Sequence, residues 1–84
     1  MWWLLLGGLL TVAVVSVIIY KSISWESIEE TAKDKHILGD LIIDSVNRST
    51  NTIKLSSLEN EEELEITGTD IEDYIEEGDI IYVY

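Results

Sequence analysis

The sequence contains no cysteine and no proline, and His36 is its only histidine. Without cysteine, the chain has no disulfide to hold a small fold together and no thiolate ligands for a metal. A single histidine also excludes a zinc site built from several imidazoles. The absence of proline means that no stretch is marked as a rigid linker. With 84 residues, the chain has room for one small domain and for no buried active-site cleft.

Basic residues are scarce, and the charge is strongly one-sided. Seventeen acidic residues face five lysines and arginines, giving a net charge of −12, and no basic residue follows Lys54. Such a surface repels the phosphates of nucleic acids, so the composition predicts no nucleic-acid partner. Either the acidic face is simply solvated, or it binds a basic protein or cations. We expect no dedicated metal site, because one acidic cluster lacks the Asp-x-Asp spacing of a calcium loop: Glu59, Glu61, Glu62, Glu63 and Glu65.

The longest feature is the opening run "MWWLLLGGLLTVAVVSVIIYK", which has no charged side chain before Lys21. As a helix, its apolar part would measure about 28 Å, close to the thickness of a bilayer core. We therefore expect residues 1–21 to form a single transmembrane helix, with the lipid bilayer as one partner. A cleaved signal is disfavoured because nothing basic precedes the run. The expected anchors at the two membrane interfaces are Trp2, Trp3, Tyr20, Lys21 and Trp25.

Two further expectations depend on this span. Lys21, Lys33 and Lys35 follow the run and no basic side chain precedes it, which favours an amino end outside and a cytoplasmic domain. Small residues within the run, Gly7, Gly8 and Thr11, would let a second helix approach closely. The alternative for these small residues is contact with lipid alone.

Beyond the run, residues 22–35 are expected to form a connector, and the i,i+4 pair of Glu29 and Lys33 favours a helix there. Residues 36–84 are expected to form a small acidic domain. Its predicted strands are "HILGDLIIDSV", "TIKLSSL", "ELEIT" and "DIIYVY". "GTDIEDYIEEGD" predicts a short helix before the last strand, with Thr69 and Glu72 as a capping box and Gly78 at its end.

The expected fold class is therefore an N-terminal single transmembrane α-helix followed by a small mainly-β (α+β) domain. Its order of elements favours a partly closed OB- or SH3-like barrel with one short helix before the last strand. "EEGDIIYVY" resembles the closing turn and last strand of many such barrels.

No motif in the sequence presents a nucleophile, a phosphate loop or a cofactor site. We therefore expect no enzyme, no cofactor and no small-molecule substrate. Ile80, Tyr82 and Tyr84 alternate along the last predicted strand, and they are either covered within the domain or exposed for docking. The expected function is a non-enzymatic, single-pass membrane-anchored protein-interaction module, or accessory subunit, that binds a membrane protein or itself. The alternative is a pilin-like filament subunit with bundled apolar helices and β-rich heads outside.

Overall fold

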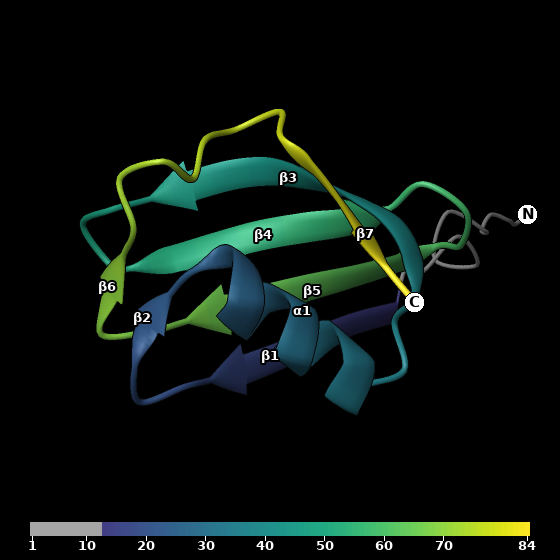
Figure 1. Cartoon of the computed structure of the whole chain (residues 1–84), viewed down its shortest axis with the longest axis horizontal. Coiled ribbons are helices and arrows are strands. Elements are labelled where there is room, and N and C mark those ends of the chain that lie inside the picture. Colours follow the sequence, from purple (N-terminus) through teal and green to yellow (C-terminus); the bar gives the residue numbers. More distant parts are fainter. Residues whose placement is uncertain (1–12) are drawn as a thin grey trace, which may run out of the picture.

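An open five-stranded sheet with a helix on one face is the centre of the fold (Figure 1). The structure is a computed structural model, and it describes residues 13–84. The strand order is β1-β5-β4-β3-β7; β1 runs parallel to β5, and the other neighbours are antiparallel. A separate two-stranded ribbon pairs β2 with β6. The elements are β1 (Ala13–Ile18), β2 (Ser22–Ile23), α1 (Trp25–Asp34), β3 (Gly39–Asn47), β4 (Thr52–Ser57), β5 (Glu62–Thr67), β6 (Asp70–Ile71) and β7 (Ile80–Val83).

Buried side chains at alternate positions of the central strands form the core. Leu55 of β4 lies opposite both Ile43 of β3 and Leu64 of β5, and all three side chains are buried. Ile28 and Ala32 of α1 are one helical turn apart and are buried in the same cluster. One face of the sheet is therefore packed against α1, and the other face, which we call the outer face, carries the alternate residues.

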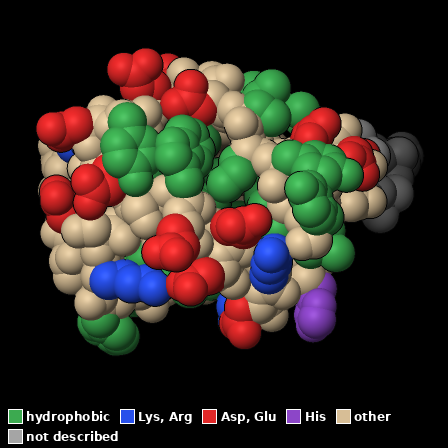
Figure 2. Space-filling model, in the orientation of Figure 1, with side chains coloured by type: hydrophobic (Ala, Val, Ile, Leu, Met, Phe, Trp, Pro, Cys, Tyr) green, Lys and Arg blue, Asp and Glu red, His purple; other side chains and the backbone are tan. Residues whose placement is uncertain are grey.

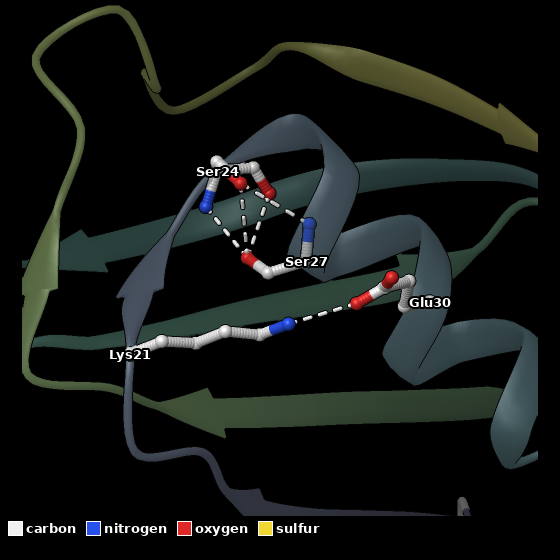
Figure 3. A network of polar contacts seen from close by, with 4 residues as sticks. All are labelled: Lys21, Ser24, Ser27 and Glu30. Atoms are coloured by element: carbon white, nitrogen blue, oxygen red, sulfur yellow. Dashed lines mark hydrogen bonds and ion pairs between the residues drawn. The ribbon is translucent and has the colours of Figure 1, made fainter.

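Local hydrogen bonds define both ends of α1. Figure 3 shows the start, where the Ser24 hydroxyl accepts from the Ser27 backbone N–H and the Ser27 hydroxyl accepts from the Ser24 N–H, a reciprocal capping box. At the end, the N–H of Ile37 donates to the Ala32 carbonyl and the N–H of His36 to the Lys33 carbonyl. This is a Schellman motif, and it requires the left-handed backbone that His36 adopts, with φ of 61°. The lone histidine thus has a structural place at the helix end.

The expected transmembrane helix over residues 1–21 is wrong in the part that the structure describes. Ala13–Ile18 form β1, paired along its length with Glu62–Thr67. The physical reason is side-chain shape: valine and isoleucine dominate this stretch and suit a strand, and Val15 and Val17 pack against the buried cluster. Within residues 13–84, no helix has the length and apolar character that crossing a bilayer requires.

This finding also corrects the expected function and location. Both the membrane-anchored module and the pilin-like filament relied on an apolar helix that reaches residue 21, and β1 occupies residues 13–18 of that stretch. The single-pass location with a cytoplasmic domain relied on the same helix. None of these expectations has support from the described residues.

The partly closed barrel and the short helix before the last strand are also wrong. The sheet is open, because β1 and β7 stand at opposite ends of its strand order. In the stretch expected to be helical, Asp70 and Ile71 pair with β2, and the guanidinium of Arg48 takes up the carbonyls that a helix would use. The helix of the described residues lies instead at 25–34, in the stretch expected to be a connector, where it packs on the sheet.

Candidate interaction surface

The outer face of the sheet carries an apolar patch at its β7 edge. In β7, Val83 is buried against the core and Ile81 is half-buried, whereas Ile80 and Tyr82 are more than half exposed. Tyr84, directly after the strand, is also exposed, and its ring lies 4.7 Å from that of Tyr82. The strand therefore has one core side and one solvent side, and its aromatic residues lie on the solvent side.

Neighbouring strands extend the patch through their register. Ile80 lies opposite Ile42 of β3, and Tyr82 lies opposite Asp40. Leu58 lies next to Asp40, because its N–H donates to the Asp40 carbonyl at 2.9 Å. Gly39 pairs with Val83. Leu38 directly precedes Gly39, and Tyr84 directly follows Val83. We define the β7 patch as Leu38, Ile42, Leu58, Ile80, Tyr82 and Tyr84; all but the half-buried Ile42 are large, exposed hydrophobic residues.

The surroundings of the β7 patch are acidic. Asp40 lies within it, and Asp79 directly precedes β7. The carboxylate of Glu59 approaches the Asp40 backbone N–H at 3.5 Å, and the carboxylate of Asp44 accepts from the Ser56 hydroxyl. Figure 2 shows hydrophobic side chains gathered along β7, with acidic side chains beside them. A partner of this surface would therefore meet apolar and aromatic contacts surrounded by negative charge.

The sequence-predicted partner-binding residues divide into two groups. Ile80, Tyr82 and Tyr84 lie together in the β7 patch and are exposed. Gly7, Gly8 and Thr11 lie outside the described residues, as do the predicted anchors Trp2 and Trp3.

The remaining predicted anchors, Tyr20, Lys21 and Trp25, lie where β1 leads into β2 and α1. Tyr20 is exposed. Trp25 begins α1 and stacks at a tilt on Tyr74, with ring centroids 5.9 Å apart. Lys21 donates to the Glu30 carboxylate at 2.8 Å (Figure 3).

The contact with Glu30 affects the charge state of Lys21. The hydrogen bond from Lys21 to Glu30, helped by the negative charge of Glu30, raises the pKa of Lys21 above its ordinary 10.5. The stabilisation by this pair is thus fully present below the ordinary pKa and is lost as the pH rises through the raised value. Because both side chains are well exposed to solvent, the pair contributes little to stability.

Sequence reasoning missed Leu38 and Leu58 as members of the patch. Leu38 and Ile42 occupy alternate positions with Asp40 along one stretch, a signal that was available. However, the apolar residues of "HILGDLIIDSV" lie on both faces, which pointed to burial on both sides. Leu58 joins only through the pairing of β4 with β3.

Other kinds of site have no counterpart in residues 13–84. This part of the chain encloses no pocket, and it brings no three histidine, aspartate or glutamate side chains together in a way that could hold a metal ion. A scan against protein-family models gave no match, and searches of curated proteins and of solved structures gave none either.

Proposed function

We propose that this domain is a non-enzymatic protein-binding module that uses the β7 patch to bind a partner with an apolar centre and a basic rim. The observation that carries the proposal is the exposure of Ile80, Tyr82 and Tyr84 beside one another on a strand whose opposite side is core. Clustered exposed hydrophobic residues mark interaction surfaces more often than scattered ones do. Tyrosine suits such a surface because it offers a large apolar ring and a polar tip.

Charge supports the choice of partner. The chain carries a net charge of −12 and has no basic residue from Leu55 to Tyr84, a stretch that includes β7. If two β7 patches packed against each other, Asp40 and its acidic neighbours would face the same carboxylates of the second copy and repel them. A basic rim on the partner would instead attract these carboxylates and raise the association rate. Because salt screens the charges, that rate should fall as the salt concentration rises.

The test is a photo-crosslinking residue placed at Tyr82 of the full chain, expressed in its native cells. The matched control carries the same residue at Tyr74, because the two tyrosines are about equally exposed, at 54% and 50%. We expect a discrete adduct with one protein from position 82 and none from position 74. Asp40→Lys should reduce the adduct several-fold by adding a repulsive charge without removing apolar surface.

Two results would contradict the proposal. One is the same adducts from positions 82 and 74, which would indicate random collisions. The other is no adduct at position 82 in a chain shown to be folded by circular dichroism.

A further inference from the structure

The opposite edge of the sheet is formed by β1, an uncharged strand with no second neighbouring strand among residues 13–84. Among the described residues, β5 is the one strand that pairs with β1. β1 reads AVVSVI, with no charge and no proline to discourage another strand from pairing with it. β7, the other edge strand, has only four residues, and short edge strands are poor templates for pairing. β1 is thus the more exposed template for strand addition.

The direction of its backbone groups follows from one hydrogen bond. The N–H of Ile19, directly after β1, donates to the Thr67 carbonyl at 2.8 Å, so the amide of Ile19 faces β5. Backbone groups alternate in direction along a strand. The N–H and C=O groups of Val14, Ser16 and Ile18 therefore face the free edge. On the outer face of the sheet, Val14 and Ile18 are also more than half exposed.

We propose that two copies of this chain pair through β1, antiparallel and centred on Ser16, to form one continuous sheet. In this register Ser16 lies opposite Ser16 of the second copy, and Val14 lies opposite Ile18 in both directions. All the outward-facing backbone groups of these three residues then find a partner. On the inner face, Val15 lies opposite Val17, so between residues 14 and 18 every cross-strand pair except the central one joins two branched aliphatic side chains.

A register shifted by two residues fits less well. It would place Val14 opposite Ser16 and leave Ile18 without a partner inside the strand. Any antiparallel register of two identical strands is two-fold symmetric, so the pairing of the side chains is what favours the register centred on Ser16.

The distribution of charge favours β1 over any other edge for this contact. The nearest acidic side chains on the outer face are Glu63 and Glu65 of β5, and Glu65 already accepts from the Ser16 hydroxyl and lies 4.0 Å from Lys54. In the dimer the two β5 strands would be three strand spacings apart, about 14 Å. This separation exceeds the screening length of about 8 Å at physiological salt. The two β7 patches lie at the far edges and stay free, so the dimer does not depend on the proposed function.

Sedimentation of the full chain tests the dimer. At high micromolar concentration we expect the mass to rise from 9.5 kDa toward twice that value, and salt should strengthen the association because it screens the repulsion between two acidic chains. Ser16→Lys should weaken the dimer about tenfold or more, because two lysines would face each other, while a single lysine in the monomer can pair with Glu65. Ser16→Val should tighten it about threefold by adding a branched pair.

Tyr82→Lys is the matched control, since it adds the same charge at the other edge and should leave the dissociation constant unchanged. Because the chain lacks cysteine, Ser16→Cys also allows a clean check of the register with a short thiol crosslinker. We expect Ser16→Cys to give crosslinked dimers and Ser49→Cys, in the exposed turn after β3, to give none.

A chain that stays monomeric at high concentration would overturn the proposal. So would equal association of the wild type, Ser16→Lys and Ser16→Val, or equal crosslinking through positions 16 and 49. If Ser16→Lys does not fold, Ser16→Val and the crosslinking result still decide the question.

Discussion

Arg48 holds the segment between β6 and β7 in place. Its guanidinium donates to the carbonyls of Ile71 at 2.9 Å and Ile75 at 2.8 Å, with longer contacts to those of Glu72 and Asp73. A planar fork of donors can serve several carbonyls at once. The carboxylates of this segment repel one another, and Arg48 is the basic residue that reaches its backbone. Arg48 thus helps to fix the path by which the chain reaches β7 and its patch, together with the backbone hydrogen bonds that join Ile43 to Gly78 and Asp79.

We expect Arg48→Ala to lower the free energy of unfolding by about 2 kcal/mol, because charged hydrogen bonds to several carbonyls are lost. Arg48→Lys should recover only part of this, since an ammonium group cannot form the fork. Lys54→Ala is the control: it removes an exposed ion pair and should cost less than about 1 kcal/mol. Urea unfolding followed by circular dichroism measures all three. Equal stability of Arg48→Lys and the wild type would show that the fork has no special role.

At the scale of elements, alternation predicted four of the five strands of the main sheet, but the expected partial closure into a barrel is wrong. The stretches predicted around β3, β4, β5 and β7 are all strands in the structure. The expected helix over residues 1–21 is wrong because an unbroken apolar stretch fits a helix or a strand, and the pairing of Ala13–Ile18 with β5 selects the strand. Conversely, the period of residues 69–78 suits a helix, but the contacts with β2 and Arg48 override it. Such long-range contacts cannot be predicted from the local pattern of apolar and polar residues.

The end of α1 offers a test of one element by itself. His36 adopts a left-handed conformation in which a side chain is strained, so His36→Gly should stabilise the domain by about 0.5 kcal/mol after the flexibility of glycine is subtracted. In a domain of this size, the thermal midpoint should rise by about 2–4 °C. Lys35→Gly is the control, because Lys35 has φ of −96° and the same change there should lower the midpoint. A fall in the midpoint of His36→Gly would contradict the Schellman assignment.

At the scale of the whole molecule, the sequence predicts three residues of the candidate surface, the β7 patch, and misses how far that surface extends. The stripe of Ile80, Tyr82 and Tyr84 follows from alternation within one strand. Leu38 and Leu58 join it only because β3 pairs with both β4 and β7, which is a property of the topology. The net charge of −12, in contrast, follows directly from the composition, because it does not depend on how the sheet is formed.

That net charge predicts how the domain responds to salt. Folding concentrates the carboxylates on a small surface and makes them repel one another, so screening should stabilise the folded chain. We expect the urea midpoint to rise as sodium chloride increases from 0.02 to about 0.3 M, over which the screening length falls several-fold. Low micromolar protein keeps association from contributing. Glu61→Lys, which changes an exposed residue and reduces the net negative charge by two, should make the midpoint less sensitive to salt. A midpoint that falls with salt in the wild type would show that its few ion pairs outweigh the repulsion.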